Sequence, residues 1–535
     1  MDRHMYSLAA LTPHRCWLGT VLLLTALSLW PIWRLPCPPL QDYPPHLWLA
    51  QVVSSYDQRE DLRALYSCRL RPGPYSLFDL LIVGFTRWFS VDVAGRAALS
   101  IVVLLTTTLV LVLASGQASH GRAQERTPST GADTTPAGGV GTCGTAASPG
   151  PPWGALVLFP LTFNQQYYLG NINFLLSIPL LLLGLLSQDV IQERGTTPLR
   201  AALHGVVLLA LFLAHPFTVL AYFGLSVLRA LAGRPPARPL LVSAVLPTVL
   251  AIGTVLWVAL LNGPDPSAAP TRWSVDWLPF RVSAIYLLSM FTGLVWHDGV
   301  DGWAVATWTT LGLALAAAAF TGSGAAGGRR DPLRLPLLAT ALAVFVLPGC
   351  IGAFTYINLR LSPVAYFLLG AGAASSRASG PLALLIVTLT ATCLAGSLQK
   401  QSRLAGEIAE VIPLVTRIPP GEPLLPLVFD RYSPHLDGAL FTPHLHVHNY
   451  YHLLTGGGWN PYLFRQPFVN CRLKDPRLLV GPGEIAPEAF DWGAHGGPYR
   501  YIVVRAAPPA AVGELSKKAR LVGTSGRWLL FHKVR

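Results

Sequence analysis

The sequence predicts a polytopic α-helical membrane protein with about eleven transmembrane helices and a small α/β domain at its C-terminal end. Of its 535 residues, 52% are hydrophobic and only 12% are charged, and the mean hydropathy is +0.46. Soluble proteins carry about 25% charged residues, so this balance is typical of a membrane protein. Apolar runs recur through residues 1–400, and the composition changes in residues 401–535. We therefore divide the chain there into a transmembrane domain and an extracytoplasmic α/β domain.

Apolar runs of roughly 17–23 residues are long enough to cross the hydrocarbon core of a bilayer. The first run follows a basic segment and ends in the sequence WPIWR, which is typical of a membrane interface. No small-residue cleavage site follows it, so we interpret it as an uncleaved helix. The predicted spans are residues 16–35, 93–115, 153–169, 171–188, 200–215, 217–233, 239–261, 302–321, 335–354, 361–376 and 380–398.

Residues 75–90 predict an amphipathic helix in the membrane interface, because apolar side chains recur at helical spacing around Asp79 and Arg87. The alternative is a twelfth spanning helix, which would reverse the orientation of everything after it. Arginine favours the interfacial helix. With the N-terminus inside, twelve arginines then fall in cytoplasmic segments, whereas the outer connections are mostly long or poor in Lys and Arg. The first outer loop, residues 36–92, is an exception with several arginines of its own. We expect a cytoplasmic N-terminus and an extracytoplasmic C-terminal domain.

Two regions outside the spans have distinct compositions. Residues 116–152 are rich in Gly, Ser, Thr, Ala and Pro, which predicts a disordered cytoplasmic linker. Residues 402–418 predict an amphipathic helix that connects the last span to the C-terminal domain. That domain is predicted to contain strands at 426–430 and 499–504, a short helix at 509–518 and a hairpin at 519–534 that turns at Ser525-Gly526.

The net charge of +13 would suggest nucleic-acid binding in a soluble protein. Here most Lys and Arg residues lie in short loops between apolar runs, where they set orientation and can meet anionic membrane lipids. The chain has no basic patch interleaved with aromatic residues, so we expect no nucleic-acid partner.

The seven cysteines form no CxxC pair, which argues against a zinc site built on cysteine. Cys37 and Cys68 could form a disulfide if the first loop is extracytoplasmic, although free thiols are the default expectation. Walker A, GxSxG and HExxH motifs do not occur in the sequence, and no Rossmann fingerprint, a GxGxxG between a strand and a helix, is indicated.

The segment DYPPH, residues 42–46, places an acid and an imidazole where the first helix leaves the bilayer. Asp42 precedes Pro-Pro and an apolar helical run, so it is a good helix N-cap. A carboxylate at the outer rim could also take a proton from a sugar-acceptor hydroxyl, as a general base. His46 could orient Asp42, contact a phosphate or donate to a backbone carbonyl. We therefore assign Asp42 and His46 as candidate catalytic residues.

Residues 161–176, LTFNQQYYLGNINFLL, bring amides and tyrosines to the junction of two apolar runs. One interpretation is hairpin capping with an aromatic belt. The other is a hydrogen-bonding surface for a sugar or phosphate, because a tight turn needs fewer such groups. The candidate substrate-binding residues are Asn164, Gln165, Gln166, Tyr167, Asn171 and Asn173.

Three more candidates for substrate binding lie at the same outer end. His215 follows an apolar run in FLAHPF, and histidine within a membrane often marks a polar cavity. Arg360 in YINLRLSP needs an anionic partner at the membrane rim, which a lipid-linked phosphate or a protein carboxylate would provide. Arg272 lies in the charged outer loop 262–301, whose WHDGVDG sequence also fits a solvated turn.

His444, His446, His448 and His452 suggest a metal site by composition. The first three alternate as on a strand, whereas His448 and His452 share a helix face, and these geometries conflict. The following NYYHLL favours an ordinary helix. We therefore predict no metal ligands and expect polar residues that face the membrane domain.

The layout resembles the GT-C superfamily of membrane glycosyltransferases, which includes protein O-mannosyltransferases and aminoarabinose transferases. It resembles most a group of bacterial membrane proteins with a DYPxH-type start to the first loop and a C-terminal YYxLxxGGxxPxLF-type segment. Here these are DYPPH (42–46) and YYHLLTGGGWNPYLF (450–464), and VDVAGR (91–96) introduces the second span. The likeness covers most of the chain in layout, but its motifs are short.

The resemblance implies a sugar transfer from a polyprenyl-phosphate donor to an extracytoplasmic acceptor, at a bacterial cytoplasmic membrane. The first-loop acid of the family corresponds to Asp42, the general base, and the lipid phosphate would leave toward an arginine such as Arg360. Many members carry a second acid in the outer hairpin, where this chain has Asn171 and Asn173. A divalent metal is compatible with the family but no motif here supports one.

Two other functions compete with sugar transfer. A GT-C-like scaffold without transferase activity would bind a lipid or an envelope partner, and the missing second acid favours it. A transporter is the weaker alternative, because the sequence has no strong internal repeat and most charges lie near the ends of the apolar runs.

Overall fold

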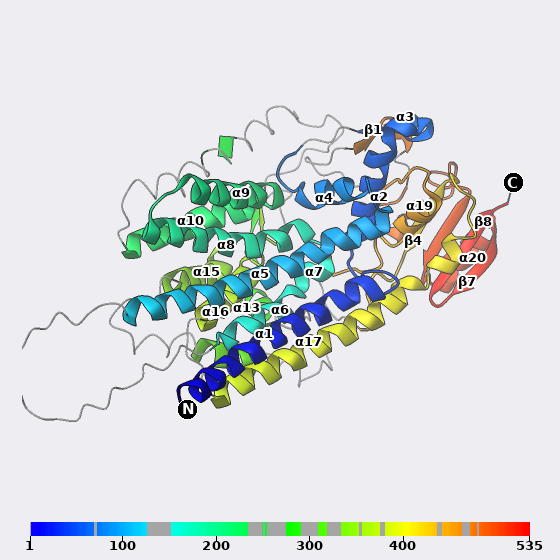
Figure 1. Ribbon diagram of the computed structural model, residues 1–535. Coiled ribbons are helices and arrows are strands. Elements are labelled where there is room, and N and C mark those ends of the chain that lie inside the picture. The colour runs from blue at the N-terminus through cyan, green and yellow to red at the C-terminus, as the bar shows by residue number, and fades with distance from the viewer. Residues whose placement is uncertain are drawn as a thin grey trace, which may run out of the picture.

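The computed structural model is mostly helical and ends in a small β-sheet. Helices α1, α5, α8 and α17 run along an elongated bundle, and the sheet lies at one end of it with the C-terminus (Figure 1). The described residues are 2–68, 72–125, 151–233, 249, 252–253, 274–289, 309–317, 333–351, 356–374, 380–435, 441–462, 471–478 and 481–534.

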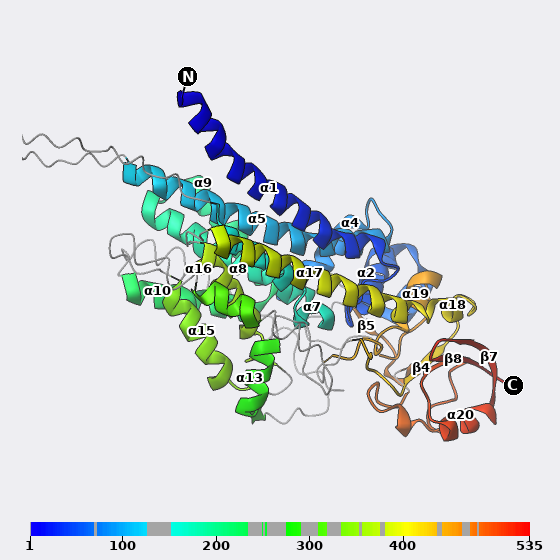
Figure 2. The same cartoon turned by 90° about the horizontal axis from the view of Figure 1, so that it is seen from below.

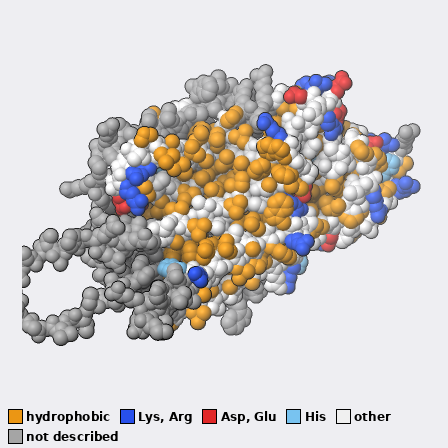
Figure 3. All heavy atoms as spheres, viewed as in Figure 1, with side chains coloured by type: hydrophobic (Ala, Val, Ile, Leu, Met, Phe, Trp, Pro, Cys, Tyr) orange, Lys and Arg blue, Asp and Glu red, His pale blue; other side chains and the backbone are white. Residues whose placement is uncertain are grey.

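The bundle is consistent with a membrane protein. Among the described residues, four helices are long and apolar enough to cross a bilayer: His14–Arg34, Val91–Ser115, Ile172–Arg194 and Pro381–Val415. Shorter apolar helices cover Pro198–Ala214, Pro216–Arg229, Leu335–Val346 and Leu361–Ala374. Hydrophobic side chains cover most of the visible side of the bundle, and charged ones are more frequent towards the sheet (Figure 3).

Apart from α13 (Phe280–Ser289), which lies in the predicted outer loop 262–301, the helices of the bundle are close to the predicted spans where both are described. They are α1 (Asp2–Arg34), α5 (Val91–Glu125), α8 (Ile172–Arg194), α9 (Pro198–Ala214), α10 (Pro216–Gly233), α13 (Phe280–Ser289), α15 (Arg334–Val346), α16 (Leu361–Ala374) and α17 (Gly380–Ala409). The predicted span 239–261 lies almost wholly outside the described residues, and only 309–317 of the predicted span 302–321 is described, as helix.

Three segments differ from the prediction. In the predicted span 335–354, the helix ends at Val346 and Cys350–Ile351 forms a strand. The predicted span 153–169 is broken into η2 (Trp153–Val157), α6 (Leu158–Thr162) and α7 (Gln165–Leu169). The break occurs because the side chain of Asn164 accepts from the backbone N–H of Gln166 and starts a new helix. Helix α5 continues to Glu125, into the predicted linker, whose residues 126–150 lie outside the described part.

The first outer loop folds as short elements over the end of the bundle. They are α2 (Tyr43–Ser55), η1 (Tyr56–Gln58), α3 (Glu60–Leu65), β1 (Tyr66–Cys68) and α4 (Leu77–Phe85). Helix α4 has nine residues, and a helix of that length extends only about 14 Å. The alternative of a twelfth spanning helix is therefore wrong. Trp88 and Phe89, just beyond α4, are exposed, and their place in the interface stays a prediction.

The VDVAGR sequence at the start of α5 ties α1, α2 and α5 together. The Arg96 guanidinium donates to the carbonyls of Ile32, Leu35 and Pro36 at 2.6–3.0 Å, which satisfies the C-terminal end of α1. Its Nε lies 2.9 Å from the Asp92 carboxylate. Gly95 allows α2 to pack closely, because a Cβ there would lie 2.6 Å from the Tyr43 hydroxyl.

The C-terminal domain contains a four-stranded sheet in the order β4-β6-β8-β7. Strands β4 (Leu424–Val428) and β6 (Tyr501–Arg505) are parallel, and β8 (Trp528–Lys533) is antiparallel to β6 and to β7 (Ala519–Ser525). The β7–β8 hairpin confirms the predicted turn. The domain also contains α18 (Ile412–Val415), α19 (Asn449–Thr455), η4 (Pro476–Leu478), η5 (Pro487–Ala489) and α20 (Pro509–Ser516).

Two connections hold this domain against the bundle. Helix α17 is continuous to Ala409, so the expected break between a span and a connecting helix at 402 is wrong. Figure 2 shows α17 running from the bundle to α18 beside the sheet. Near its end, Glu407 lies 2.6 Å from the fully buried Arg505 and 3.2 Å from His444.

The second connection is a disulfide between Cys68 and Cys471, which are 403 residues apart in sequence. Strand β1 pairs with β5 (Cys471–Leu473) and places the two cysteines opposite each other. The suggested disulfide between Cys37 and Cys68 is therefore wrong. The expectation that the cysteines are free thiols is also wrong for Cys68 and Cys471. Cys37 is a buried free thiol. Elsewhere, β2 (Val275–Asp276) pairs with β3 (Cys350–Ile351).

Candidate functional site

Asp42 lies where the first loop meets the polar hairpin of residues 164–173. The backbone N–H of Gln41 donates to the Tyr168 carbonyl at 2.9 Å, and that of Asp42 to the Leu169 carbonyl at 3.3 Å. Gly170 has a φ of +80° and allows this approach, because a Cβ there would lie 2.6 Å from the Asp42 nitrogen. The first loop and the polar hairpin are predicted to reach the same end of the bundle, and these hydrogen bonds show that they are in direct contact there.

The Asp42 side chain does not cap its helix. Asp42 occupies the N-cap position of α2, but its carboxylate makes no hydrogen bond to that helix. Oδ1 instead lies 3.3 Å from Nε2 of His446 and accepts from Gln41 Nε2 at 3.3 Å. The capping interpretation is therefore wrong for the side chain, because the carboxylate has a partner in the C-terminal domain.

His446 bridges two carboxylates. Its Nε2 faces Asp42, and its Nδ1 lies 2.7 Å from Oε1 of Glu484. Burial lowers the pKa of His446, but the charges of Glu484 and Asp42 and their hydrogen bonds outweigh it and raise the pKa to about 10. We call Asp42, His446 and Glu484 the carboxylate clamp.

His46 pairs with an acid that the sequence analysis did not assign. Its Nδ1 lies 2.8 Å from Oδ1 of Asp79 in the first turn of α4. Burial lowers the pKa of His46, but the charge and hydrogen bond of Asp79 more than compensate, and the pKa is raised. The partner at Nδ1 is thus a carboxylate rather than the expected carbonyl.

Several side chains of the polar hairpin are used within the fold. Asn164 caps α7, Gln166 accepts from Asn171 at 2.7 Å, and the Tyr167 hydroxyl donates to Gln401 at 3.2 Å. Asn173 accepts from the Phe78 N–H and donates to the Tyr75 carbonyl, each at 2.8 Å, and so positions the start of α4.

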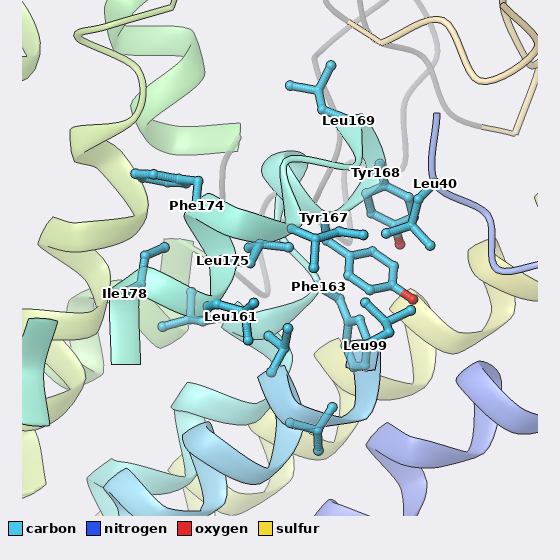
Figure 4. Packing of buried hydrophobic residues seen from close by; sticks show 14 of the residues in the cluster. Leu40, Leu99, Leu161, Phe163, Tyr167, Tyr168, Leu169, Phe174, Leu175 and Ile178 are labelled. Carbon is cyan, nitrogen blue, oxygen red and sulfur yellow. The ribbon is translucent and has the colours of Figure 1, made fainter. Parts of the chain in front are cut away.

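These hydrogen bonds favour the capping interpretation for the hairpin. Gln165 is also buried, and its Nε2 has no hydrogen-bond partner. Figure 4 shows Phe163, Tyr167 and Tyr168 packed near Leu40 and Leu99. A role of the candidate hairpin residues in substrate binding stays a prediction.

Arg360 lies just before α16, with an incomplete set of partners. Its Nη1 is 3.1 Å from Nε2 of His215 and 3.5 Å from the Tyr75 hydroxyl, and its buried Nε has no partner. Within the described part of the chain, no carboxylate lies within ion-pair distance of it. Tyr75 and Tyr356 both have a positive φ, 63° and 59°, a strain that often accompanies functional sites.

His215 cannot complete the hydrogen bonding of Arg360. Its Nδ1 lies 3.2 Å from the backbone N–H of Phe217, and its Nε2 faces Arg360. A neutral imidazole can accept at only one nitrogen, so one of these two donors lacks an acceptor. If Nδ1 accepts from the Phe217 N–H, Nε2 carries the hydrogen, and an anionic oxygen beside Arg360 would accept from this N–H and from the guanidinium. We call Tyr75, His215 and Arg360 the arginine cluster.

The arginine cluster and the clamp lie at the same end of the bundle. Segment 75–79 contacts the arginine cluster through Tyr75 and Arg360. It approaches the clamp through Asp79, which pairs with His46, one turn after Asp42. Asn173 fixes this segment from the polar hairpin. The surroundings of Asp42 and of Arg360 are therefore connected through one short piece of backbone.

The other histidines of the 441–464 segment have separate partners. His444 contacts Glu407, His448 lies 3.3 Å from Asn460, and His452 stacks on Trp48. Burial lowers the pKa of His448 and of His452 to about 4. The described residues contain no group of three or more His, Cys, Asp or Glu placed to hold a metal ion.

A divalent cation at Asp42 does not fit this arrangement. The carboxylate faces N–H donors from His446 and Gln41. In the hairpin, Asn171 turns its amide nitrogen to Gln166. We therefore derive no step through a metal.

Some predicted site residues lie outside the described part of the structure, and some contacts in the structure are not predicted from the sequence. Arg272 and the WHDGVDG sequence lie outside the described residues. Tyr75, Asp79 and Glu484 are not predicted as site residues from the sequence, and His446 is expected only to face the membrane domain. The histidine-rich segment was a signal for His446, but Glu484 lies in an ordinary loop without one.

No protein-family model matches the chain, and no curated protein matches it significantly.

Proposed function

We propose that the protein is an inverting membrane glycosyltransferase of GT-C-like architecture, with about eleven transmembrane helices. It would transfer a sugar from a polyprenyl-phosphate donor to an extracytoplasmic acceptor at a bacterial cytoplasmic membrane. The observation that carries the proposal is that segment 75–79 contacts both Arg360, a guanidinium without a described carboxylate partner, and His46, one turn after the Asp42 carboxylate.

In this mechanism Asp42 is the general base. It accepts the proton of the acceptor hydroxyl, and the oxygen attacks the anomeric carbon of the donor sugar. The bond between that carbon and the phosphate oxygen breaks, so the electron pair leaves with polyprenyl phosphate. Arg360, with His215 and Tyr75, stabilises the negative charge on the leaving phosphate.

The disulfide supports the proposed orientation. Disulfides persist in oxidising compartments and are rare in the cytosol, and Cys68–Cys471 joins the first loop to the C-terminal domain. Both would then lie outside the cytoplasm, with the N-terminus of α1 inside. The exposed leucines of the bundle, such as Leu203, Leu338 and Leu384, would face membrane lipids.

The test is donor turnover by the purified full chain in detergent, on a panel of polyprenyl-phosphate sugars. We expect the wild type to release polyprenyl phosphate and Asp42→Asn to release none. Asp57→Asn is the matched control, since Asp57 is an exposed carboxylate in the same loop. Equal turnover by Asp42→Asn and the wild type would contradict the role of Asp42.

A second candidate is a GT-C-like scaffold without transferase activity. It is favoured by Asn171, because the polar hairpin has an amide where many related enzymes carry an acid. Native mass spectrometry separates the two proposals. A polyprenyl lipid bound to both wild type and Asp42→Asn, without turnover of any donor, would support the scaffold.

A further inference from the structure

His446 reaches Asp42 from the C-terminal domain, 404 positions away in the chain. Both ring nitrogens face carboxylate oxygens, at 3.3 Å for Asp42 and 2.7 Å for Glu484. Carboxylates only accept hydrogen bonds, and only a protonated imidazole donates from both nitrogens. The geometry therefore describes an imidazolium between two acids.

The backbone around His446 is held on both sides. The Gln41 side-chain oxygen accepts from the backbone N–H and the hydroxyl of Thr442, at 2.8 and 2.9 Å. On the other side, the Asn449 side chain donates to the His446 carbonyl at 2.9 Å. His446 is also buried. Gln41 also donates to Asp42, so one side chain contacts both the proposed base and the segment that carries His446.

We propose that His446 is a positioning residue, which holds Asp42 in the orientation where it accepts the acceptor proton, so that the C-terminal domain completes the active site. This inference rests on the proposed function. The Glu407–Arg505 pair and the Cys68–Cys471 disulfide would then keep the site assembled by keeping the domain docked.

The charges around His446 make a specific variant informative. Asp42 and Glu484 contact it, and His46, with its partner Asp79, and His448 lie close enough to interact electrostatically. His446→Gln removes the cation and leaves two carboxylates facing each other across an amide. Like charges close together repel each other, so the pH profile of turnover should differ from that of the wild type.

The first test is the pH dependence of donor turnover by the full chain. We expect His446→Gln to lower kcat roughly tenfold to hundredfold, with little change in KM for the donor. The acid limb of the profile should move to higher pH. In the double variant His446→Gln/Glu484→Gln, removal of the second carboxylate should return the acid limb towards the wild-type position.

Two results would overturn the inference. One is a wild-type kcat and pH profile in His446→Gln. The other is an acid limb that stays unmoved while activity falls, which indicates a structural role only. His448→Gln is the matched control, because His448 is two residues away and equally buried but contacts Asn460. It should keep the wild-type profile.

A measurement without turnover separates this inference from the proposed function. We would follow thermal unfolding of the full chain between pH 7 and 10. His446→Gln and Asp42→Asn should both weaken the loss of stability at alkaline pH, and His448→Gln should not. If the wild type turned over no donor, the proposed function would fail, and this result would still decide whether the clamp exists.

If His446→Gln does not fold, Glu484→Gln replaces it. This variant removes the far partner of the histidine and leaves Asp42 untouched. We expect a smaller loss of turnover than in His446→Gln, again with a weaker loss of stability at alkaline pH. Unchanged behaviour in both measurements would overturn the clamp.

Discussion

Two arginines at the same end of the bundle have opposite surroundings. Arg96 donates to three carbonyls and pairs with Asp92, so its charge and its donors are used within the fold. Arg360 has one imidazole nitrogen and one distant hydroxyl, and its Nε has no partner. A partly buried guanidinium without an anion is costly unless a ligand supplies one.

This difference separates residues that build the site from residues that bind at it. Arg96 closes the end of α1 and places the chain that leads to Asp42, so it supports the site from outside. The Arg360 Nε has no partner, which fits the proposed anion. Removing the first should therefore weaken folding, whereas removing the second should weaken binding. The predictions below begin with the largest expected effect.

Arg96→Gln should destabilise the protein. The substitution leaves the carbonyls of Ile32, Leu35 and Pro36 without the donors that satisfy them, at a cost of about 3 kcal/mol. Thermal unfolding in detergent measures this effect. The same substitution at Arg360 is the control, and it should cost much less. Equal losses at both positions would remove the distinction between the two arginines.

Arg360→Gln should weaken the binding of polyprenyl phosphate roughly tenfold to hundredfold, because a charge-assisted hydrogen bond contributes about 1.5–3 kcal/mol. Titration of the detergent-solubilised protein with a short-chain polyprenyl phosphate measures the affinity. A matched titration with the corresponding polyprenol, which lacks the phosphate, should show no difference between variant and wild type. Unchanged phosphate affinity would mean that the anion binds elsewhere.

The His46–Asp79 pair predicts a pH dependence of stability. The folded-state pKa of His46 is raised, so the pair contributes stability that is complete below the unfolded-state pKa of about 6.5. This contribution is lost as the pH rises through the folded-state pKa. Asp79→Asn should flatten that part of the stability curve, as followed by thermal unfolding from pH 5 to pH 8. A curve identical to that of the wild type would contradict the pair.

Tyr75→Phe should have the smallest effect. The Tyr75 hydroxyl lies 3.5 Å from Arg360, which is long for a hydrogen bond, so we expect phosphate affinity to fall about twofold to threefold. The same titration measures it. A loss as large as that of Arg360→Gln would place the hydroxyl in direct contact with the anion and revise the geometry of the arginine cluster.

Much of the fold follows from local patterns. Apolar runs are sufficient to predict α8, α9, α10 and α16, because hydropathy and helical periodicity act within one segment. The β7–β8 hairpin also follows from its alternation and from Ser525-Gly526. The break after α6 is not predicted from the sequence, because the apolar residues around Asn164 form a run long enough to be interpreted as one span.

Within the site, sequence reasoning identifies Asp42 and Arg360, since a charged residue at the rim of an apolar run is conspicuous. It cannot identify their partners. Nothing near Asp42 points to His446, and nothing near Cys68 points to Cys471. The same local logic favours a capping role for Asp42 and pairs Cys68 with the nearer Cys37.

Composition, apolar periodicity and rim charges thus specify a membrane protein with helices and a small α/β domain. Packing alone decides that the C-terminal domain contributes His446 to Asp42, that Asp79 rather than a carbonyl holds His46, and that Arg360 meets no described carboxylate. The physical reason is the separation in sequence between the residues that interact. Helix formation depends on neighbours a few residues away, whereas these contacts join positions that approach only when the bundle and the domain have docked.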